Sequence, residues 1–282
     1  MRGLSAGSGQ VFPCGLRNAR EKLGAVGANK TTPPDFSAMK SRGDRFAALT
    51  AYDFPMARRL DRLGVPLILV GDSLGMVVLG YEDTTQVTMG DMEHHLRACA
   101  RVKPGALLAA DLPYSSYQTP DQAVRNARRL RDAGAEAVKA EGGAAIEGQV
   151  RAIVDEGIPF IGHLGMLPQS VKEEGGYRVK GKSEDERERL LEEARLLQDC
   201  GAFAVVLELV KPAVAAEITR SVSISTIGIG AGPDCDGQIL VTNDLLRTSG
   251  DYIPRHVPDA AVNVGDQTNA VIAEWKQSVE RG

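Results

Sequence analysis

The chain has 282 residues, of which 43% are hydrophobic and 25% are charged, and its formal net charge is −4. A chain of this length can bury a sizeable core as one domain or two, and an eight-unit α/β barrel needs about 250 residues. The small negative charge, without any block of like charges, excludes the basic footprint of a nucleic-acid-binding protein. We therefore expect a small-molecule ligand.

The four cysteines are widely spaced and include no C-x-x-C pair, which argues against a disulfide framework and a zinc site: Cys14, Cys99, Cys200 and Cys235. No apolar stretch reaches the roughly 18 residues of a membrane span, and the N-terminus lacks the apolar core of a secretory signal. We therefore expect a soluble protein of the reducing cytoplasm, without nucleic-acid or membrane partners.

Residues 1–29 are rich in Gly and Ala, with scattered Arg and a single acidic residue, Glu21. This composition allows a transit peptide, but we favour an unstructured extension or an over-long start. We expect a disordered N-terminal extension over residues 1–29 and a single barrel domain over residues 30–282.

Apolar runs that alternate with helical stretches predict parallel strands buried on both faces. In chain order, the seven predicted strands lie near residues 46–52, 67–71, 106–111, 135–141, 159–163, 203–208 and 224–230. An eighth strand rests on GQILV (237–241), which is followed by a Pro-containing segment near 252–258.

The helices between these strands have recognisable ends. Thr119-Pro120-Asp121-Gln122 combines an N-cap, a proline at the first helical position and a capping-box Gln, and Ser183 with Glu186 repeats the box before a helix over 184–200. A glycine C-cap ends four helices, in LDRLGVP, LRDAGAE, IVDEGIP and LQDCGAF. This β-α order predicts a (β/α)8 barrel. The competing architecture is a doubly wound open sheet, whose usual G-x-G-x-x-G loop after the first strand is missing.

Residues 166–183, MLPQSVKEEGGYRVKGKS, form an unusually long polar connection for a barrel. A loop of this kind at the catalytic end closes over substrate in some enzymes. A surface excursion that contacts a neighbouring subunit is an equally good interpretation.

Three apolar runs, LILVGDS, LLAADLP and AVKAEGG, deliver carboxylates at their ends: Asp72, Asp111 and Glu141. His163 and Glu208 occupy the same position on two further strands. These ends converge on one face of a barrel. Oxygen ligands favour Mg²⁺ or Mn²⁺, with Asp72 and Asp111 as direct ligands and Glu141 as a ligand or water-bridged partner. For any single carboxylate, a helix N-cap or a loop salt bridge is the alternative.

The remaining polar residues suggest roles around a bound 2-oxo acid. Lys139 shares a side of its strand with Glu141, and it neutralises a bound anion, forms a Schiff base or makes a structural ion pair. His163 donates to a substrate oxygen or is a satisfied core histidine. Apolar neighbours would raise the pKa of Glu208, which makes it our candidate for the general base.

These residues lie in stretches that resemble the ketopantoate hydroxymethyltransferase (PanB) family, and the most specific are GDSLG and HLGMLPQS. The matching stretches run in order over about residues 45–241: LTAYDFPMA, VGDSLGMVVLGYEDTTQVT, ADLPYSSY, VKAEGG, GHLGMLPQSV, GGYRVKG, LELV, IGIGAG and CDGQILV. The resemblance implies a phosphoenolpyruvate/pyruvate-like barrel that converts 3-methyl-2-oxobutanoate into 2-dehydropantoate, on the route to pantothenate and coenzyme A. It also implies one Mg²⁺ per subunit, 5,10-methylenetetrahydrofolate as co-substrate and a homo-oligomer such as a decamer.

Residue by residue, the resemblance implies that Asp72 and Asp111 bind the metal and that Glu141 lies beside it. Ser73, Lys139 and His163, together with Asp111, would contact the oxo acid, and Glu208 would remove its C3 proton. The metal would stabilise the resulting enolate, which attacks the methylene carbon of the folate. Two other functions stay open: a folate-independent lyase or mutase on a related barrel, and a non-catalytic small-molecule-binding barrel.

Overall fold

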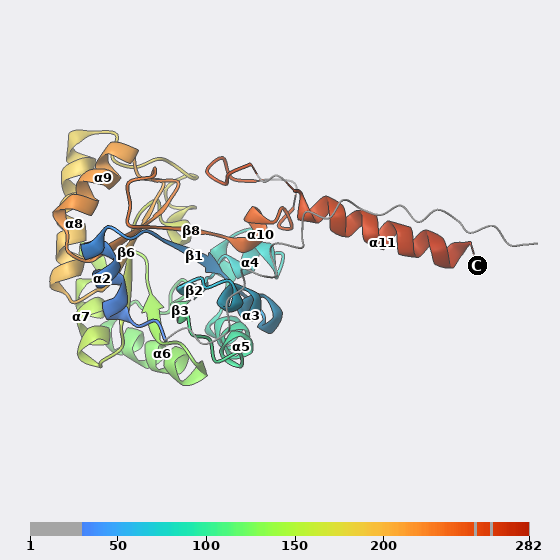
Figure 1. Cartoon of the computed structure of the whole chain (residues 1–282). Helices are drawn as coiled ribbons and strands as arrows, with labels where there is room; N and C mark the ends of the chain where they lie inside the picture. Colours follow the sequence, from blue (N-terminus) through green and yellow to red (C-terminus); the bar gives the residue numbers. More distant parts are fainter. Residues whose placement is uncertain (1–29, 251–252, 260–261, 282) are drawn as a thin grey trace, which may run out of the picture.

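A closed barrel of eight parallel strands forms the centre of the protein (Figure 1). The computed structural model describes residues 30–250, 253–259 and 262–281, so the predicted extension over residues 1–29 lies outside the described residues. The strands follow one another around the barrel, and β8 pairs with β1: β1 (Phe46–Thr50), β2 (Leu67–Val70), β3 (Leu107–Asp111), β4 (Ala137–Lys139), β5 (Phe160–Gly165), β6 (Ala204–Glu208), β7 (Ser225–Ile229) and β8 (Gly237–Leu240). The predicted (β/α)8 fold is confirmed, including its eighth strand, and the open sheet is excluded.

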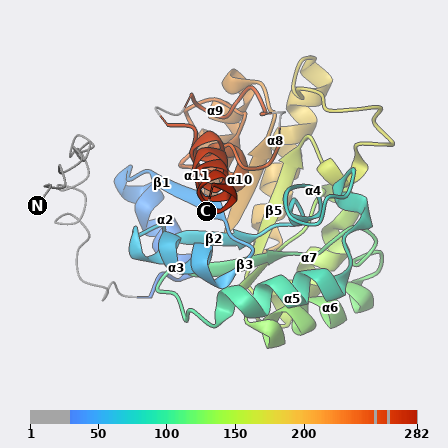
Figure 2. The ribbon, with the colours of Figure 1, turned by 90° about the vertical axis from the view of Figure 1, so that its right-hand side faces the viewer.

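Helices cover the outside of the barrel, where α5 and α6 pack side by side (Figure 2). The α-helices are α2 (Pro33–Arg42), α3 (Phe54–Arg62), α4 (Leu74–Val77), α5 (Met89–Ala100), α6 (Pro120–Ala133), α7 (Glu147–Asp155), α8 (Glu184–Asp199), α9 (Pro212–Ser221), α10 (Thr242–Leu245) and α11 (Val264–Glu280). Short 3-10 turns lie at η1 (Thr84–Gln86), η2 (Ala144–Ile146) and η3 (Pro168–Ser170).

The predicted helix ends are largely confirmed. The glycine after α6, Gly134, has a φ of 116°, and a side chain there would place Cβ 2.4 Å from Cβ of Ala100, so only glycine fits. Thr119 caps α6 by accepting a hydrogen bond from the N–H of Gln122. The reciprocal half of that predicted capping box is wrong, because Gln122 accepts from the N–H of Gln118, one residue before the cap.

Side-chain alternation divides the apolar residues of the strands into two layers. Leu67 and Leu69 of β2 point into the barrel with Leu107 of β3, whereas Ile68 and Val70 pack outward among the helices. The barrel interior is therefore a packed hydrocarbon core, and only its two ends are available for polar chemistry.

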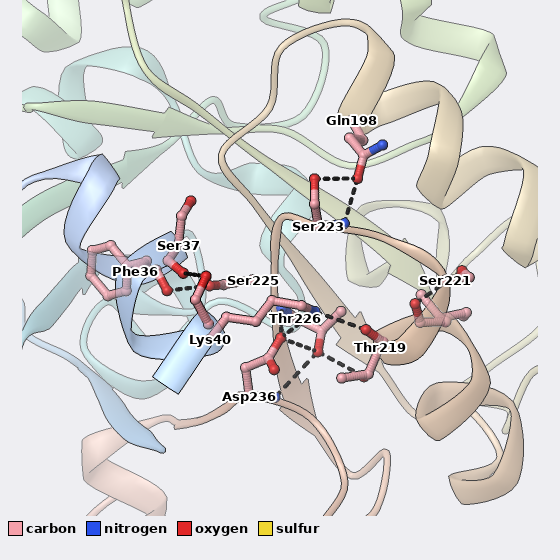
Figure 3. Close-up of polar contacts among 12 residues, drawn as sticks. Phe36, Ser37, Lys40, Gln198, Thr219, Ser221, Ser223, Ser225, Thr226 and Asp236 are labelled. Atoms are coloured by element: carbon pink, nitrogen blue, oxygen red, sulfur yellow. Dashed lines mark hydrogen bonds and ion pairs between the residues drawn. The ribbon is translucent and has the colours of Figure 1, made fainter. Parts of the chain in front are cut away.

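Helix α2 closes the amino-terminal end of the barrel. Its Phe36 is fully buried, with its ring centroid 5.0 Å from that of Phe46 and 5.8 Å from that of Phe203. The carbonyl of Phe36 also accepts a hydrogen bond of 2.9 Å from Oγ of Ser225 in β7 (Figure 3).

An ion pair fixes α2 in this position. Nζ of Lys40 lies 2.8 Å from Oδ2 of Asp236 and donates to the carbonyl of Thr219 at 2.8 Å (Figure 3). The same carboxylate oxygen accepts from the N–H of Thr226 at 2.8 Å and from its hydroxyl at 3.1 Å. With side chains only 16% and 13% exposed, the pair is mostly removed from solvent.

Helix α11 extends away from the barrel instead of packing on it (Figure 1). None of its described residues is buried, and Val271, Ile272, Trp275 and Val279 are between 58% and 69% exposed. Among the described residues, no helix has both the length and the apolar character needed to cross a membrane.

We predict that Asp236→Ala lowers the free energy of unfolding by about 3 kcal/mol, because it leaves a mostly buried ammonium and two Thr226 donors without their acceptor. Urea unfolding measures this loss. The matched control is Asp44→Ala, which breaks the exposed Arg42–Asp44 pair of 2.7 Å and should cost less than about 1 kcal/mol. Equal losses in the two variants would contradict the proposed closure.

Candidate active site

The carboxyl ends of the strands surround a cavity of about 800 Å³. The residues predicted for the site all line it: Asp72, Ser73, Asp111, Lys139, Glu141, His163 and Glu208. Five different strands or the turns that follow them supply these side chains. The structure therefore brings the predicted residues together, while their individual roles stay predictions.

Strand alternation explains why four of these side chains face the cavity. Asp111, Lys139, His163 and Glu208 each lie an even number of residues after an inward-facing apolar residue of the same strand. The register sets Asp111 directly beside Lys139 on β3 and β4. The predicted strand over 135–141 is too long, because β4 ends at Lys139, although Glu141 still lines the cavity.

Asp72, Asp111 and Lys139 form a cluster of buried polar contacts in the cavity. The N–H of Asp72 donates to Oδ2 of Asp111 at 3.1 Å, and Nζ of Lys139 lies 3.1 Å from Oδ1 of Asp111. Burial alone would lower the pKa of Lys139, but the carboxylates of Asp111, Glu141 and Asp72 outweigh it and raise the pKa above the usual lysine value. The amine is therefore protonated, which favours anion binding or an ion pair over a Schiff base.

His163 lies between this lysine and Glu208. Its Nδ1 is 3.2 Å from Nζ of Lys139, and its Nε2 is 3.3 Å from Oε2 of Glu208. Burial and the Lys139 charge hold the pKa of His163 well below its usual value, so the ring is neutral. Because an ammonium only donates, Nδ1 accepts and the ring proton is on Nε2, which has no hydrogen-bond partner of good geometry among the described residues.

The carboxylates crowd together in a way that suits a cation. Burial, followed by the charge of Asp111, raises the pKa of Asp72 to about 7, and burial with the charge of Asp72 raises the pKa of Glu141 well above its usual value. Oδ1 of Asp111 is buried and has no hydrogen-bond partner of good geometry. A divalent cation would stabilise this concentration of negative charge.

Within the described ranges, no group of three or more His, Cys, Asp or Glu side chains has the arrangement of a preformed metal site. Mg²⁺ commonly takes only one or two protein carboxylates and fills its other positions with water and substrate oxygens. Asp72 and Asp111 fit this pattern. Glu141 fits the role of a water-bridged partner, which is one of the two roles that the sequence analysis gave it.

Glu208 is the last residue of β6, and it lies on the other side of the His163 ring from Lys139. Burial raises the pKa of its carboxyl to about 7, although the charges of Lys139 and His256 oppose that shift. A carboxylate with a pKa near neutrality is well matched to accepting a proton from a weak carbon acid.

Residues 166–183 cover part of the cavity. Pro168, Tyr177 and Val179 line it, and the N–H of Lys180 donates to the carbonyl of Leu209 just after β6. These contacts favour the interpretation as a cover over substrate. The alternative, contact with a neighbouring subunit, stays untested.

Sequence reasoning assigned no role to three other polar residues at the site. The hydroxyl of Tyr52 lies 2.9 Å from Oγ of Ser73, Gln169 contacts two of the carboxylates, and His256 lines the cavity. Tyr52 and Gln169 belong to the stretches LTAYDFPMA and GHLGMLPQSV, which carried the family resemblance, so the signal was present without a role attached. His256 belongs to the Pro-containing segment after β8.

Comparison with known families decides the relationship that these motifs suggested. The family model described as ketopantoate hydroxymethyltransferase matches residues 30–282. The chain belongs to this family. The resemblance drawn from the strand-end motifs is therefore confirmed, and the family match includes the segment after residue 241 that those motifs did not reach.

Relatives within the family are similar over nearly their whole length. A protein of Moorella thermoacetica named 3-methyl-2-oxobutanoate hydroxymethyltransferase is 48% identical over 256 residues, which is 90% of this chain and 95% of the relative. A protein of Syntrophus aciditrophicus with the same name is 48% identical over 255 residues, covering 90% and 93% of the two chains.

Solved structures agree on the fold. A 2,3-dimethylmalate lyase, described as a member of the PEP mutase/isocitrate lyase superfamily, superposes with a TM-score of 0.56 at 17% identity, covering 89% of this chain and 99% of the lyase. At this identity the likeness concerns the fold alone, and it agrees with the predicted (β/α)8 barrel.

Proposed function

We propose that the protein transfers a hydroxymethyl group from 5,10-methylenetetrahydrofolate to 3-methyl-2-oxobutanoate and so forms 2-dehydropantoate, a precursor of pantothenate. Membership of the ketopantoate hydroxymethyltransferase family supports the activity. The observation that carries the mechanism is the meeting of Lys139, His163 and Glu208 beside two aspartates in one cavity.

Asp72 and Asp111 would hold one Mg²⁺, with Glu141 as a third ligand or a water-bridged partner. When bound, the cation supplies positive charge where the keto oxygen of the substrate becomes negative. Ser73, Lys139 and His163, with Asp111, would bind the oxo acid. The protonated Lys139 matches the substrate carboxylate in charge, and the Nε2 proton of His163 is available to a substrate oxygen.

Glu208 would then accept the C3 proton of the bound oxo acid. The electron pair left at C3 forms a bond to the methylene carbon of the folate. Both carbon–nitrogen bonds of that methylene bridge break, water supplies the hydroxyl group, and the proton from C3 and the remaining proton of water end on the two folate nitrogens. Burial of Glu208 keeps its carboxylate poorly solvated, which makes it a stronger base than an exposed glutamate. Holding both reactants in one cavity replaces a bimolecular encounter with an oriented one.

We further propose a cytoplasmic homo-oligomer, with a decamer as one candidate, and a single domain over residues 30–282. The apolar residues that α11 exposes, among them Trp275, support association because isolated apolar faces of this kind are costly in water. Sedimentation velocity of the full chain measures the assembly, and a monomer at micromolar concentration would rule the association out.

Glu208→Gln should slow the exchange of the C3 proton of 3-methyl-2-oxobutanoate with deuterated water by at least about 100-fold, because an amide does not accept that proton. Proton NMR measures the exchange without folate, and calorimetry should find the oxo acid still bound. The matched control is Glu188→Gln, an exposed glutamate of α8. Unaltered exchange in Glu208→Gln would refute the base assignment and favour a non-catalytic barrel.

The wild-type exchange rate should increase as pH rises through about 7 and then level off. Only the carboxylate form of Glu208 accepts a proton, and its pKa is raised to about 7. A rate that is flat between about pH 5.5 and 8.5 disagrees with this assignment.

Asp72→Ala combined with Asp111→Ala should abolish both turnover and its stimulation by Mg²⁺. A coupled assay with 3-methyl-2-oxobutanoate and methylenetetrahydrofolate, with and without EDTA, measures this loss. Asp185→Ala, which removes an exposed carboxylate of α8, should keep the wild-type response. Full wild-type turnover in EDTA would overturn the metal assignment, and cleavage of an oxo acid without folate would favour a lyase.

A further inference from the structure

Gln169 is the one buried polar residue that the segment 166–183 contributes to the described part of the protein. It lies in the turn η3, at the start of the segment, and is only 4% exposed. A polar side chain buried this deeply needs partners for each of its hydrogen-bonding groups.

All of these groups are matched, and two partners are proposed metal ligands. Nε2 of Gln169 donates to Oδ2 of Asp72 at 2.7 Å and to the carbonyl of Leu112 at 3.0 Å. The backbone N–H of Gln169 donates to Oε2 of Glu141 at 2.9 Å. Its Oε1 accepts from the hydroxyl of Tyr117 at 2.5 Å.

Only one orientation of the Gln169 amide satisfies this set of contacts. Exchanging Nε2 and Oε1 would place a carbonyl oxygen against the Leu112 carbonyl, which accepts only, and against the Asp72 carboxylate. The Tyr117 hydroxyl donates to Oε1 from the other side. One oxygen each of Asp72 and Glu141 is therefore held in a fixed direction, which limits where the second oxygen can point.

We propose that Gln169 is a positioning residue for the metal site, and that it makes metal binding and the seating of residues 166–183 mutually dependent. This inference rests on the proposed function, because the metal itself belongs to that proposal. Groups that hydrogen-bond to metal ligands orient them, and their loss commonly weakens metal binding by 10- to 100-fold.

The mutual dependence follows from the position of Gln169 in the chain. Elsewhere in the segment, the 2.7 Å ion pair that Lys172 makes with Asp83 involves a lysine side chain that is 63% exposed. Gln169 instead joins the segment to Asp72 and Glu141. If the seated segment increases metal affinity by holding these carboxylates in place, then bound metal must increase the equilibrium constant for seating the segment by the same factor.

The test is a titration of the full chain with Mn²⁺ alone, followed by electron paramagnetic resonance. Gln169→Met keeps the side-chain volume and the backbone hydrogen bond to Glu141 but removes the side-chain hydrogen bonds, including the one to Asp72, and the dissociation constant should rise by about 10- to 100-fold. Tyr117→Phe leaves Gln169 in place without its anchor, and it should raise the constant by a smaller factor. It also keeps the inference testable if Gln169→Met does not fold.

The matched control is Gln149→Met. Gln149 donates to the carbonyls of Tyr117 and Gln118 at 3.2 Å and 3.3 Å and contacts neither carboxylate, so Mn²⁺ affinity should stay within about twofold of the wild type. As a second measurement, saturating Mn²⁺ should slow trypsin cleavage after the exposed Arg178 in the wild type, and should do so much less in Gln169→Met.

Wild-type Mn²⁺ affinity in both Gln169→Met and Tyr117→Phe would overturn the inference while leaving the proposed reaction intact. Trypsin protection that is equal in the wild type and Gln169→Met would overturn the coupling. A wild-type chain that does not bind Mn²⁺ would overturn the metal assignment itself, and that failure is visible before any substitution is made.

Discussion

The alternation of side chains along a closed parallel barrel is the constraint on which the site depends. In β3, β4 and β6, hydrocarbon side chains fill the inward positions up to the last one, which is taken by Asp111, Lys139 and Glu208 respectively. A shift of one residue in any strand would send its charged side chain outward among the helices. The packed core therefore fixes the directions in which these functional groups point.

Electrostatics follows from that placement. Carboxylates in a low-dielectric cavity repel one another, and Lys139 alone offsets only part of their charge. The same burial that makes the aspartates receptive to a cation gives Glu208 its basicity and keeps His163 neutral. The same buried environment therefore shifts the pKa values of neighbouring side chains in different directions: it raises those of Asp72, Glu141 and Glu208 and lowers that of His163.

The sequence predicted what depends on local pattern: the order of the strands, the glycine after α6 and the carboxylates at strand ends. It did not predict contacts set by the path of loops. Gln169 reaches Asp72 across 97 positions of sequence, and no local periodicity encodes that approach. The closure of the barrel by Phe36 and the early end of β4 at Lys139 likewise depend on tertiary packing.

Helix α11 has a practical consequence for work in solution. Trp275 is the only tryptophan in the chain, and its side chain is 69% exposed on this helix. Its fluorescence therefore reports on α11 without any contribution from the barrel. A shift of emission to shorter wavelength would signal that the indole has left water, whatever covers it, and would do so without a label or a substitution.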